Sequence, residues 1–187
     1  NTILQQELKK ILNGRFSQSE STRLNYSRGE DTYDPILSKA VVFPETNEEV
    51  SKILKLCNEH KVPVVPFGTG TSLEGNVVGN DKGITISLEK MNKILTVNTQ
   101  DFDCRVQACV TREQLNDYLR EDGVFFPIDP GANAAIGGMA STSASGTMAV
   151  KYGTMKTVIT GLTVVLPNGE IMNTGGRTKK TSAGYNL

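Results

Sequence analysis

Two loops built almost wholly from small residues carry the groups of this sequence that could hold a ligand. Residues 66–75 read PFGTGTSLEG and follow the apolar run 62–65. Residues 129–138 read DPGANAAIGG, and a second small-residue stretch, STSASG, follows at 141–146. Small side chains let backbone amides approach an anion closely, because no bulky group keeps the ligand away. One such loop indicates a phosphate. Two in one compact domain indicate a ligand with a diphosphate and a second polar end, such as a dinucleotide.

Neither of the two common nucleotide-binding signatures fits the first loop. Gly68 and Gly70 match the start of the dinucleotide-binding pattern Gly-x-Gly-x-x-Gly, but Leu73 stands at its third glycine. A Walker loop would end in Gly-Lys-Ser/Thr, and Lys180 is preceded by Lys179 instead of glycine. Taken alone, the loop is also compatible with an ordinary hairpin-like connection. The second small-residue cluster argues against that simpler interpretation.

The second cluster could serve a ligand or could serve packing. Its backbone groups and hydroxyls suit the edge of a flat heteroaromatic ring, where donors and acceptors alternate. Small residues also allow a helix to pack tightly on a sheet, and for Ala140 and Ala144 we favour packing. Valine substitutions should separate the two roles. We expect Gly70→Val to weaken ligand binding in a folded protein, and Gly138→Val to damage folding more.

The composition argues against several partners and sites. Twenty acidic and twenty basic residues among 187 give no net charge that would attract nucleic acid or a membrane surface. No stretch approaches the roughly 20 apolar residues of a membrane span. Cys57, Cys104 and Cys109 lie in apolar contexts, so we expect reduced, partly buried thiols. With His60 as the single histidine, we expect no metal site. The chain starts with asparagine, so a targeting segment could precede it.

The first loop is positioned by a predicted strand–helix–strand unit. A helix with apolar residues on one face opens the chain at Thr2, and residues 15–39 are polar and aperiodic, as in an arm lying over a domain. A short strand at 40–43 precedes a helix that begins with the capping pattern Thr46-Asn47-Glu48-Glu49. The apolar run at 62–65 then predicts a buried strand. The first loop would therefore leave the carboxyl end of a strand, where ligands bind in α/β units.

The remaining sequence predicts a second, strand-rich part. Strands are expected at 84–88, 93–97 and 105–110, and a helix capped at Thr111 should stop before Gly123. An Asn-Gly turn at 168–169 predicts a hairpin. The fold class is therefore α+β, with a small βαβ subdomain and a larger strand-rich subdomain. We expect a helix and arm at 1–37 and a ligand-binding domain at 38–187 that is incomplete at its carboxyl end.

Several runs, in this order, resemble the FAD-binding domain of the vanillyl-alcohol oxidase (PCMH-type) flavoproteins, over about residues 38–187. Within that superfamily the chain is similar to the branch that holds cytochrome-linked D-lactate dehydrogenase and the D subunit of glycolate oxidase. The runs that carry the resemblance are 66–72, 127–131, 136–140, 144–147, 152–155, 164–169 and 182–187.

The resemblance implies FAD as cofactor and assigns roles by position. The first loop resembles the one whose amides hold the FAD diphosphate, and the next two segments resemble those along the diphosphate, ribityl chain and ring. Asn76 and Tyr152 are weaker candidates. The implied cofactor-binding residues are Pro66, Phe67, Gly68, Thr69, Gly70, Thr71, Ser72, Asp129, Pro130, Gly131, Ile136, Gly137, Gly138, Thr142, Ser143, Ala144 and Ser145.

Two departures from the family pattern limit what the resemblance implies. Superfamily members that attach the ring covalently through the first loop carry a histidine where Thr71 stands, so we predict non-covalent FAD. A later Gly-rich flavin segment and the substrate domain with its histidines do not occur in this sequence. We therefore name no catalytic residue, because Asp129 is held beside Pro130-Gly131 and His60 is expected at a helix end or in solvent.

The implied activity is oxidation of a D-2-hydroxy acid, with D-lactate expected, by hydride transfer to flavin N5. The alternatives are the D subunit of glycolate oxidase, D-2-hydroxyglutarate dehydrogenase, an alkyl-glycerone-phosphate synthase, or a module that binds FAD without chemistry. Implied partners are a small 2-hydroxy acid, held by a further domain, and an acceptor such as a cytochrome or quinone. The implied location is cytoplasmic or peripheral to an energy-transducing membrane, and mitochondrial in a eukaryote.

Overall fold

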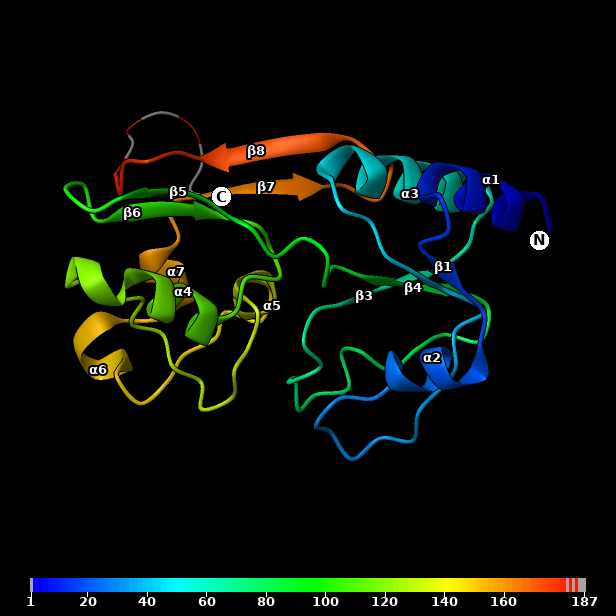
Figure 1. Cartoon of the computed structure of the whole chain (residues 1–187), viewed down its shortest axis with the longest axis horizontal. Coiled ribbons are helices and arrows are strands. Elements are labelled where there is room, and N and C mark those ends of the chain that lie inside the picture. Colours follow the sequence, from blue (N-terminus) through cyan, green and yellow to red (C-terminus); the bar gives the residue numbers. More distant parts are fainter. Residues whose placement is uncertain (1, 181, 183, 185–187) are drawn as a thin grey trace. The chain divides into compact units, whose positions relative to one another are not determined.

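The computed structural model describes residues 2–180, 182 and 184, so most of the run 182–187 quoted above lies outside the described residues. The chain divides into two compact units, Asn1–Met91 with Val165–Glu170, and Asn92–Val164 with Ile171–Leu187. Figure 1 traces the elements of both.

The first unit is built on a small sheet with the strand order β1-β2-β4-β3. Strands β2, β4 and β3 are parallel, and β1 joins β2 in antiparallel register. The predicted strand–helix–strand unit is confirmed as β2, α3 and β3, but β4 inserts between its two strands. The prediction that the strand after α3 is buried is wrong, because β3 lies at the sheet edge and only Phe67 in it is buried. The bounds are α1 Thr2–Leu12, β1 Phe16–Ser17, α2 Glu20–Asn25, β2 Val41–Val42, α3 Asn47–Glu59, β3 Val64–Phe67 and β4 Ile84–Ser87.

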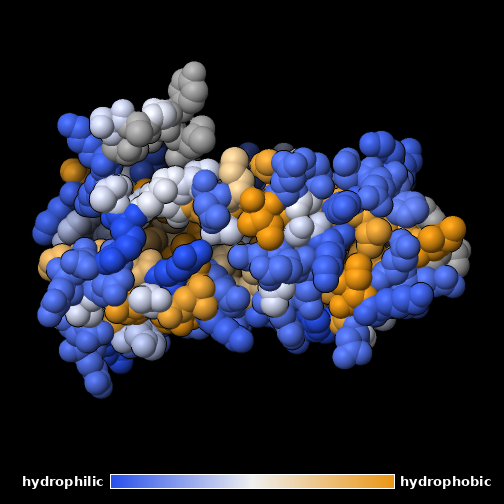
Figure 2. Space-filling model, turned by 90° about the horizontal axis from the view of Figure 1, so that it is seen from above, coloured by the Kyte–Doolittle hydropathy of each residue, from blue (hydrophilic) through white to orange (hydrophobic). Residues whose placement is uncertain are grey.

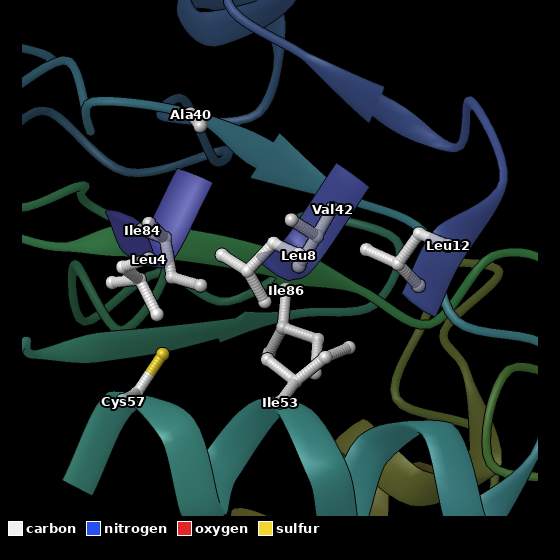
Figure 3. Packing of buried hydrophobic residues seen from close by; sticks show 9 residues of the cluster. All are labelled: Leu4, Leu8, Leu12, Ala40, Val42, Ile53, Cys57, Ile84 and Ile86. Carbon is white, nitrogen blue, oxygen red and sulfur yellow. The ribbon is translucent and has the colours of Figure 1, made fainter. Parts of the chain in front are cut away.

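Helices α1 and α3 form the core of this unit with the sheet. Leu4, Leu8 and Leu12 recur every fourth residue, so they form one stripe of α1, and all three are buried. Figure 3 shows Ile53 and Cys57 of α3 directed at the same cluster. The remaining members are Val42, Ile84 and Ile86 of the sheet and Ala40, which directly precedes β2. Burial raises the pKa of the Cys57 thiol to about 11, which keeps it protonated and unreactive.

Local capping chemistry begins the two helices predicted from it. The Thr46 hydroxyl accepts the Glu49 N–H at 3.2 Å at the start of α3. The Thr111 hydroxyl accepts the Gln114 N–H at 3.2 Å at the start of α4. These contacts satisfy backbone donors that have no partner within a helix. Both predicted helix starts are confirmed.

Over its described residues, the second unit contains two hairpins and four short helices. Its bounds are β5 Ile94–Asn98, β6 Asp103–Val106, α4 Arg112–Leu119, α5 Ile136–Ser141, α6 Ala149–Tyr152, α7 Met155–Val158, β7 Gly161–Val165 and β8 Ile171–Gly175, with a 3₁₀ turn at Arg120–Asp122. Strands β5 and β6 pair antiparallel. The predicted hairpin around residues 168–169 is confirmed as β7 and β8, whose connecting turn belongs to the first unit. Buried Ile128, Met139 and Met155 form one cluster, and Val110, Leu115 and Leu119 form another.

Surface residues are mainly hydrophilic. Figure 2 shows hydrophilic side chains over most of one face, with hydrophobic ones in separate groups between them. No helix among the described residues has both the length and the apolar character needed to cross a membrane.

Candidate functional site

The first glycine-rich loop leaves the carboxyl end of β3, as predicted. The Phe67 carbonyl still accepts the Leu88 N–H at 3.0 Å, and the regular ladder ends there. Gly70 then takes φ +73°, a conformation that favours glycine, and it is buried. Its carbonyl accepts the N–H of Glu30 at 3.0 Å. The strand end therefore passes into a loop with a fixed backbone.

The loop presents backbone donors that the chain does not use. Within the part of the chain that the structure describes, the amides of Gly68, Gly70, Thr71 and Ser72 donate to no protein acceptor. The hydroxyls of Thr69 and Thr71 lie 3.4 Å apart. Because β3 sits in a parallel sheet, these groups gather at the edge where such sheets bind ligands. Amides and hydroxyls without a carboxylate among them suit an anion.

The direction in which Gly70 would carry a side chain differs from the expectation. A Cβ atom there would lie 3.0 Å from Cζ of Phe67 and 3.3 Å from the Arg28 carbonyl oxygen. Both neighbours belong to the protein, so the missing side chain faces inward. The expectation that Gly70→Val would place a branched side chain against a ligand is therefore wrong. Valine there would strain the loop itself.

The second small-residue segment, residues 129–138, is held at its start by contacts of Asp129. Its carboxylate accepts the Gly131 N–H at 3.0 Å and lies 3.5 Å from a guanidinium nitrogen of Arg112. Its backbone carbonyl accepts the Thr147 N–H at 3.3 Å, and Gly146 packs so closely on that carbonyl that a Cβ atom would overlap it. These contacts bring 129–131 and 146–147 together. They also occupy the Asp129 carboxylate.

Helix α5 contains two adjacent glycines with different surroundings. Its first amides donate to carbonyls outside the helix. The Ile136 N–H donates to the Val110 carbonyl at 2.8 Å, and the Gly137 N–H donates to the Ala108 carbonyl at 2.7 Å. A Cβ at Gly137 would lie 2.8 Å from Cβ of Ala108, whereas one at Gly138 would meet no atom of the described residues within 4 Å. The close packing expected at Gly138 is therefore found at Gly137. Gly138 is exposed, and its side-chain direction is open.

Residues 142–145 divide between packing and exposure. Ala144 packs against the Ile128 cluster, donates to the Met139 carbonyl at 2.9 Å and accepts the Met155 N–H at 2.9 Å. Ala140 packs against the same cluster, so packing is confirmed for both alanines. The Thr142 hydroxyl donates back to the Gly138 carbonyl at 3.1 Å. Thr142, Ser143 and Ser145 are exposed.

The remaining predicted positions occupy the flanks of these segments. Pro66 is exposed within β3, and Phe67 is buried at its end. Pro130 and Gly131 are exposed. The weaker candidates are an exposed Asn76 and Tyr152, whose ring meets Phe125 edge-on at 5.5 Å.

Sequence reasoning did not single out Arg112, which forms an ion pair with Asp129 at the start of residues 129–138. Its Nε atom is buried and has no hydrogen-bond partner among the described residues, while its other nitrogens reach Asp129 and Glu113. A guanidinium with an unused donor can bind a further anionic or carbonyl oxygen. In the sequence, Arg112 is only the first residue of a capped helix. The fold places it next to Asp129.

Comparisons with known proteins agree on one family. The model of the "FAD binding domain" family matches residues 38–175. The chain is 42% identical over 183 residues to "D-lactate dehydrogenase [cytochrome], mitochondrial" of Arabidopsis thaliana, covering 97% of this chain and 32% of that protein. It is 35% identical over 174 residues to "Glycolate oxidase subunit GlcD" of Bacillus subtilis, covering 92% and 36% respectively. The chain thus spans about a third of the length of both relatives.

A solved structure gives the same result for the fold. The crystal structure of p-cresol methylhydroxylase with substrate bound superposes with a TM-score of 0.79 at 25% identity. The superposition covers 93% of this chain and 35% of that one. The predicted α+β, PCMH-type fold class is confirmed.

Proposed function

This chain belongs to the FAD-binding domain family, and on that premise we propose that it is the flavin-holding part of a D-2-hydroxy-acid dehydrogenase whose substrate is D-lactate. The family makes FAD its cofactor. The proposed substrate rests on similarity to the Arabidopsis D-lactate dehydrogenase over 97% of the chain. The Bacillus glycolate oxidase relative, at 35% identity, supports glycolate as the second candidate. Both names describe oxidation of a small 2-hydroxy acid.

The residues at the first loop fit the diphosphate of FAD. Four amides with no protein acceptor among the described residues, at Gly68, Gly70, Thr71 and Ser72, provide neutral donors for its oxygens. In the second segment, the open side of Gly138 leaves room for a group to approach the backbone closely. Arg112, whose guanidinium is paired with Asp129 and Glu113, keeps one buried donor at Nε without a partner among the described residues. Each segment by itself thus offers groups that suit part of an anionic, polar ligand.

We assign residues to parts of the cofactor on this basis. Residues 66–72 hold the diphosphate through their amides. Residues 129–131 and 136–138 run along the diphosphate, the ribityl chain and the ring. Residues 142, 143 and 145 supply hydroxyls to the next flavin contact, while Ala144 supports that stretch from the core. Bound FAD supplies the hydride acceptor, and the residues of this chain bind and orient it.

We propose that the flavin is held without a covalent bond. Threonine at position 71 has no nucleophilic ring nitrogen with which to attach the flavin. Acid precipitation of the holoprotein should release all the flavin into the supernatant, where its absorbance is measured. Flavin that stays with the precipitated polypeptide would contradict the assignment.

For the electron acceptor we propose a cytochrome. The Arabidopsis relative is named as cytochrome-linked and mitochondrial, so we also propose a mitochondrial location if the source organism is a eukaryote. A quinone is the alternative acceptor. Reoxidation of the reduced protein by cytochrome c or by a soluble quinone, followed by stopped-flow absorbance, distinguishes them.

The observation that carries the proposal is the loop of unused amides at the end of β3 in a chain of this family. Its test uses the intact protein with bound FAD under anaerobic conditions. D-lactate should bleach the oxidised flavin band, and L-lactate should leave it unchanged. If glycolate or D-2-hydroxyglutarate bleaches the flavin faster than D-lactate does, that acid replaces D-lactate as the proposed substrate. A protein that binds FAD but is reduced by none of these acids is a binding module.

A further inference from the structure

The turn at residues 28–31, Arg-Gly-Glu-Asp, has no part in the function proposed so far. It stands out in the sequence as a charged run in the middle of a polar arm. In the structure it packs against the first glycine-rich loop through backbone atoms rather than through its charges. The Glu30 N–H donates to the Gly70 carbonyl at 3.0 Å, and the Arg28 carbonyl faces the side of Gly70 on which a Cβ atom would lie.

We propose that this turn is a positioning element that fixes the orientation of the Thr71 amide for the cofactor. A trans peptide group is planar, so its C=O and N–H point in opposite directions. The peptide that joins Gly70 to Thr71 is trans, as are all described peptides. Because Glu30 holds the Gly70 carbonyl toward the arm, the Thr71 N–H must point away from the arm. The inference rests on the proposed role of the loop in binding the FAD diphosphate.

A second contact acts on the same carbonyl. At Gly29 a Cβ atom would lie 2.6 Å from Oδ2 of Asp31, 2.9 Å from Cγ2 of the buried Val77 and 3.0 Å from the Gly70 carbonyl oxygen. A side chain at this position would therefore press on Asp31 and Val77 as well as on the carbonyl that Glu30 holds. Asp31 closes the turn by accepting the Tyr33 N–H at 3.0 Å. The turn is thus built to approach the loop backbone closely.

The arm is anchored on both sides of the turn. Before it, the Tyr26 ring meets the Phe67 ring edge-on at 5.1 Å, and its hydroxyl donates to Glu89. After it, the Tyr33 ring lies against Gly75, where a Cβ atom would come within 2.7 Å of the ring. These anchors hold residue 30 in place relative to the loop. The Glu30 N–H can therefore act as a fixed donor without help from its own side chain, which is exposed.

The test compares two substitutions at one position in the intact protein. Glu30→Pro removes the N–H, whereas Glu30→Ala removes the carboxylate and keeps the N–H. After removal of the flavin, FAD and, separately, ADP are titrated, the latter as a probe with a diphosphate and no flavin ring. We expect Glu30→Pro to bind FAD and ADP about tenfold more weakly, because the ligand would lose one hydrogen bond to a charged group. Glu30→Ala should bind both ligands no more weakly than the wild type.

Two further measurements keep the proposal falsifiable if the proline variant does not fold. Gly29→Ala keeps the Glu30 N–H but crowds Asp31, Val77 and the same carbonyl oxygen, so it should displace the turn from the loop and also weaken FAD and ADP binding about tenfold. In the wild-type protein without ligand, NMR should detect the scalar coupling across the Glu30 N–H to Gly70 C=O hydrogen bond. Absence of that coupling, or wild-type affinity in both folded variants, would overturn the proposal. If the wild type binds FAD but D-lactate does not reduce it, the proposed substrate fails and the role of the turn stands.

Discussion

In the loop after β3, the direction in which Gly70 would carry a side chain is filled by the Phe67 ring and the Arg28 carbonyl, whereas at Gly138 in α5 the same direction is open. The neighbouring Gly137 resembles Gly70, because its side-chain direction is filled by Ala108. Two segments with the same composition thus use glycine differently. Gly70 lets the Phe67 ring and the Arg28 carbonyl pack closely against the loop, whereas Gly138 leaves space on the exposed side of a helix.

The difference separates two meanings of a glycine-rich segment. At Gly70 the ligand-facing groups are amides, and the glycine itself permits a turn at φ +73° and close packing. At Gly138 the absent side chain is itself the space that a ligand could use. Mutation of the first should therefore act mainly through stability and loop geometry. Mutation of the second should act mainly on ligand affinity.

The largest expected effect is at the adjacent glycines of α5. Gly137→Val should lower the free energy of unfolding by about 3 kcal/mol, since its side chain would overlap Ala108 in a packed region. Gly138→Val should leave stability within about 1 kcal/mol of wild type, because valine is no worse than glycine in a helix and its Cβ meets nothing. Urea unfolding of the flavin-free protein, followed by circular dichroism, measures both.

Flavin titration of the same pair provides the complementary measurement. Gly138→Val should weaken FAD binding despite near-normal stability. If instead Gly138→Val unfolds the protein and Gly137→Val does not, the surroundings of the two glycines described above are reversed. Wild-type FAD affinity in Gly138→Val would remove residue 138 from the proposed site.

The next effect is at the first loop. Gly70→Ala should destabilise the flavin-free protein by about 2 kcal/mol, since a left-handed conformation costs a residue with a Cβ atom about 1–2 kcal/mol and the methyl would press on Phe67 at 3.0 Å. Gly131→Ala is the matched control, because its φ is +91° but no atom lies within 4 Å of its Cβ. Thermal unfolding should show a smaller loss for Gly131→Ala. Equal losses would mean that the contacts of Gly70 contribute nothing beyond backbone strain.

Local patterns in the sequence predicted the elements that local chemistry determines. The hydroxyls of Thr46 and Thr111 begin helices by bonding amides three residues on, so their positions could be read from a few consecutive residues. The insertion of β4 between β2 and β3 could not be predicted in this way, because it depends on pairing between strands that are distant in the sequence. Helix α5 was also missed, since two glycines weaken its helix propensity and burial of Met139 compensates.

The candidate site was predicted in its segments but not in its supporting contacts. The sequence indicated the loop after β3 and the small-residue segments, and the proposed cofactor contacts there stay predictions. It could not distinguish Gly137 from Gly138, because the neighbour that distinguishes them, Ala108, is about thirty positions away in the chain. The contacts of Arg112 with Asp129 and of Glu30 with Gly70 likewise join residues distant in sequence. Such contacts depend on the completed fold.

The two units also differ in their ion pairs, and this gives the smallest expected effect. In the first unit, the Arg15 guanidinium donates two hydrogen bonds, of 2.6 and 2.5 Å, to the half-buried Glu49 carboxylate. This hydrogen bonding, helped by the Glu45 N–H, lowers the pKa of Glu49. In the second unit, hydrogen bonds from Asn98 and Arg177 lower the pKa of Asp103, but Arg177 is largely exposed. Solvent should weaken the second pair more than the first.

The sign of the pH dependence follows from the lowered pKa values. A carboxylate with a lower pKa in the folded state stabilises the protein above its unfolded pKa, and this contribution is lost as the pH falls through the folded value. Glu49→Gln should therefore cost about 1 kcal/mol at pH 7 and progressively less in acid, below the ordinary glutamate range. Asp103→Asn should cost less at neutral pH. Urea unfolding from pH 7 to pH 3 measures both, and a larger, steeper loss for Asp103→Asn would show that the exposed pair is the stronger of the two.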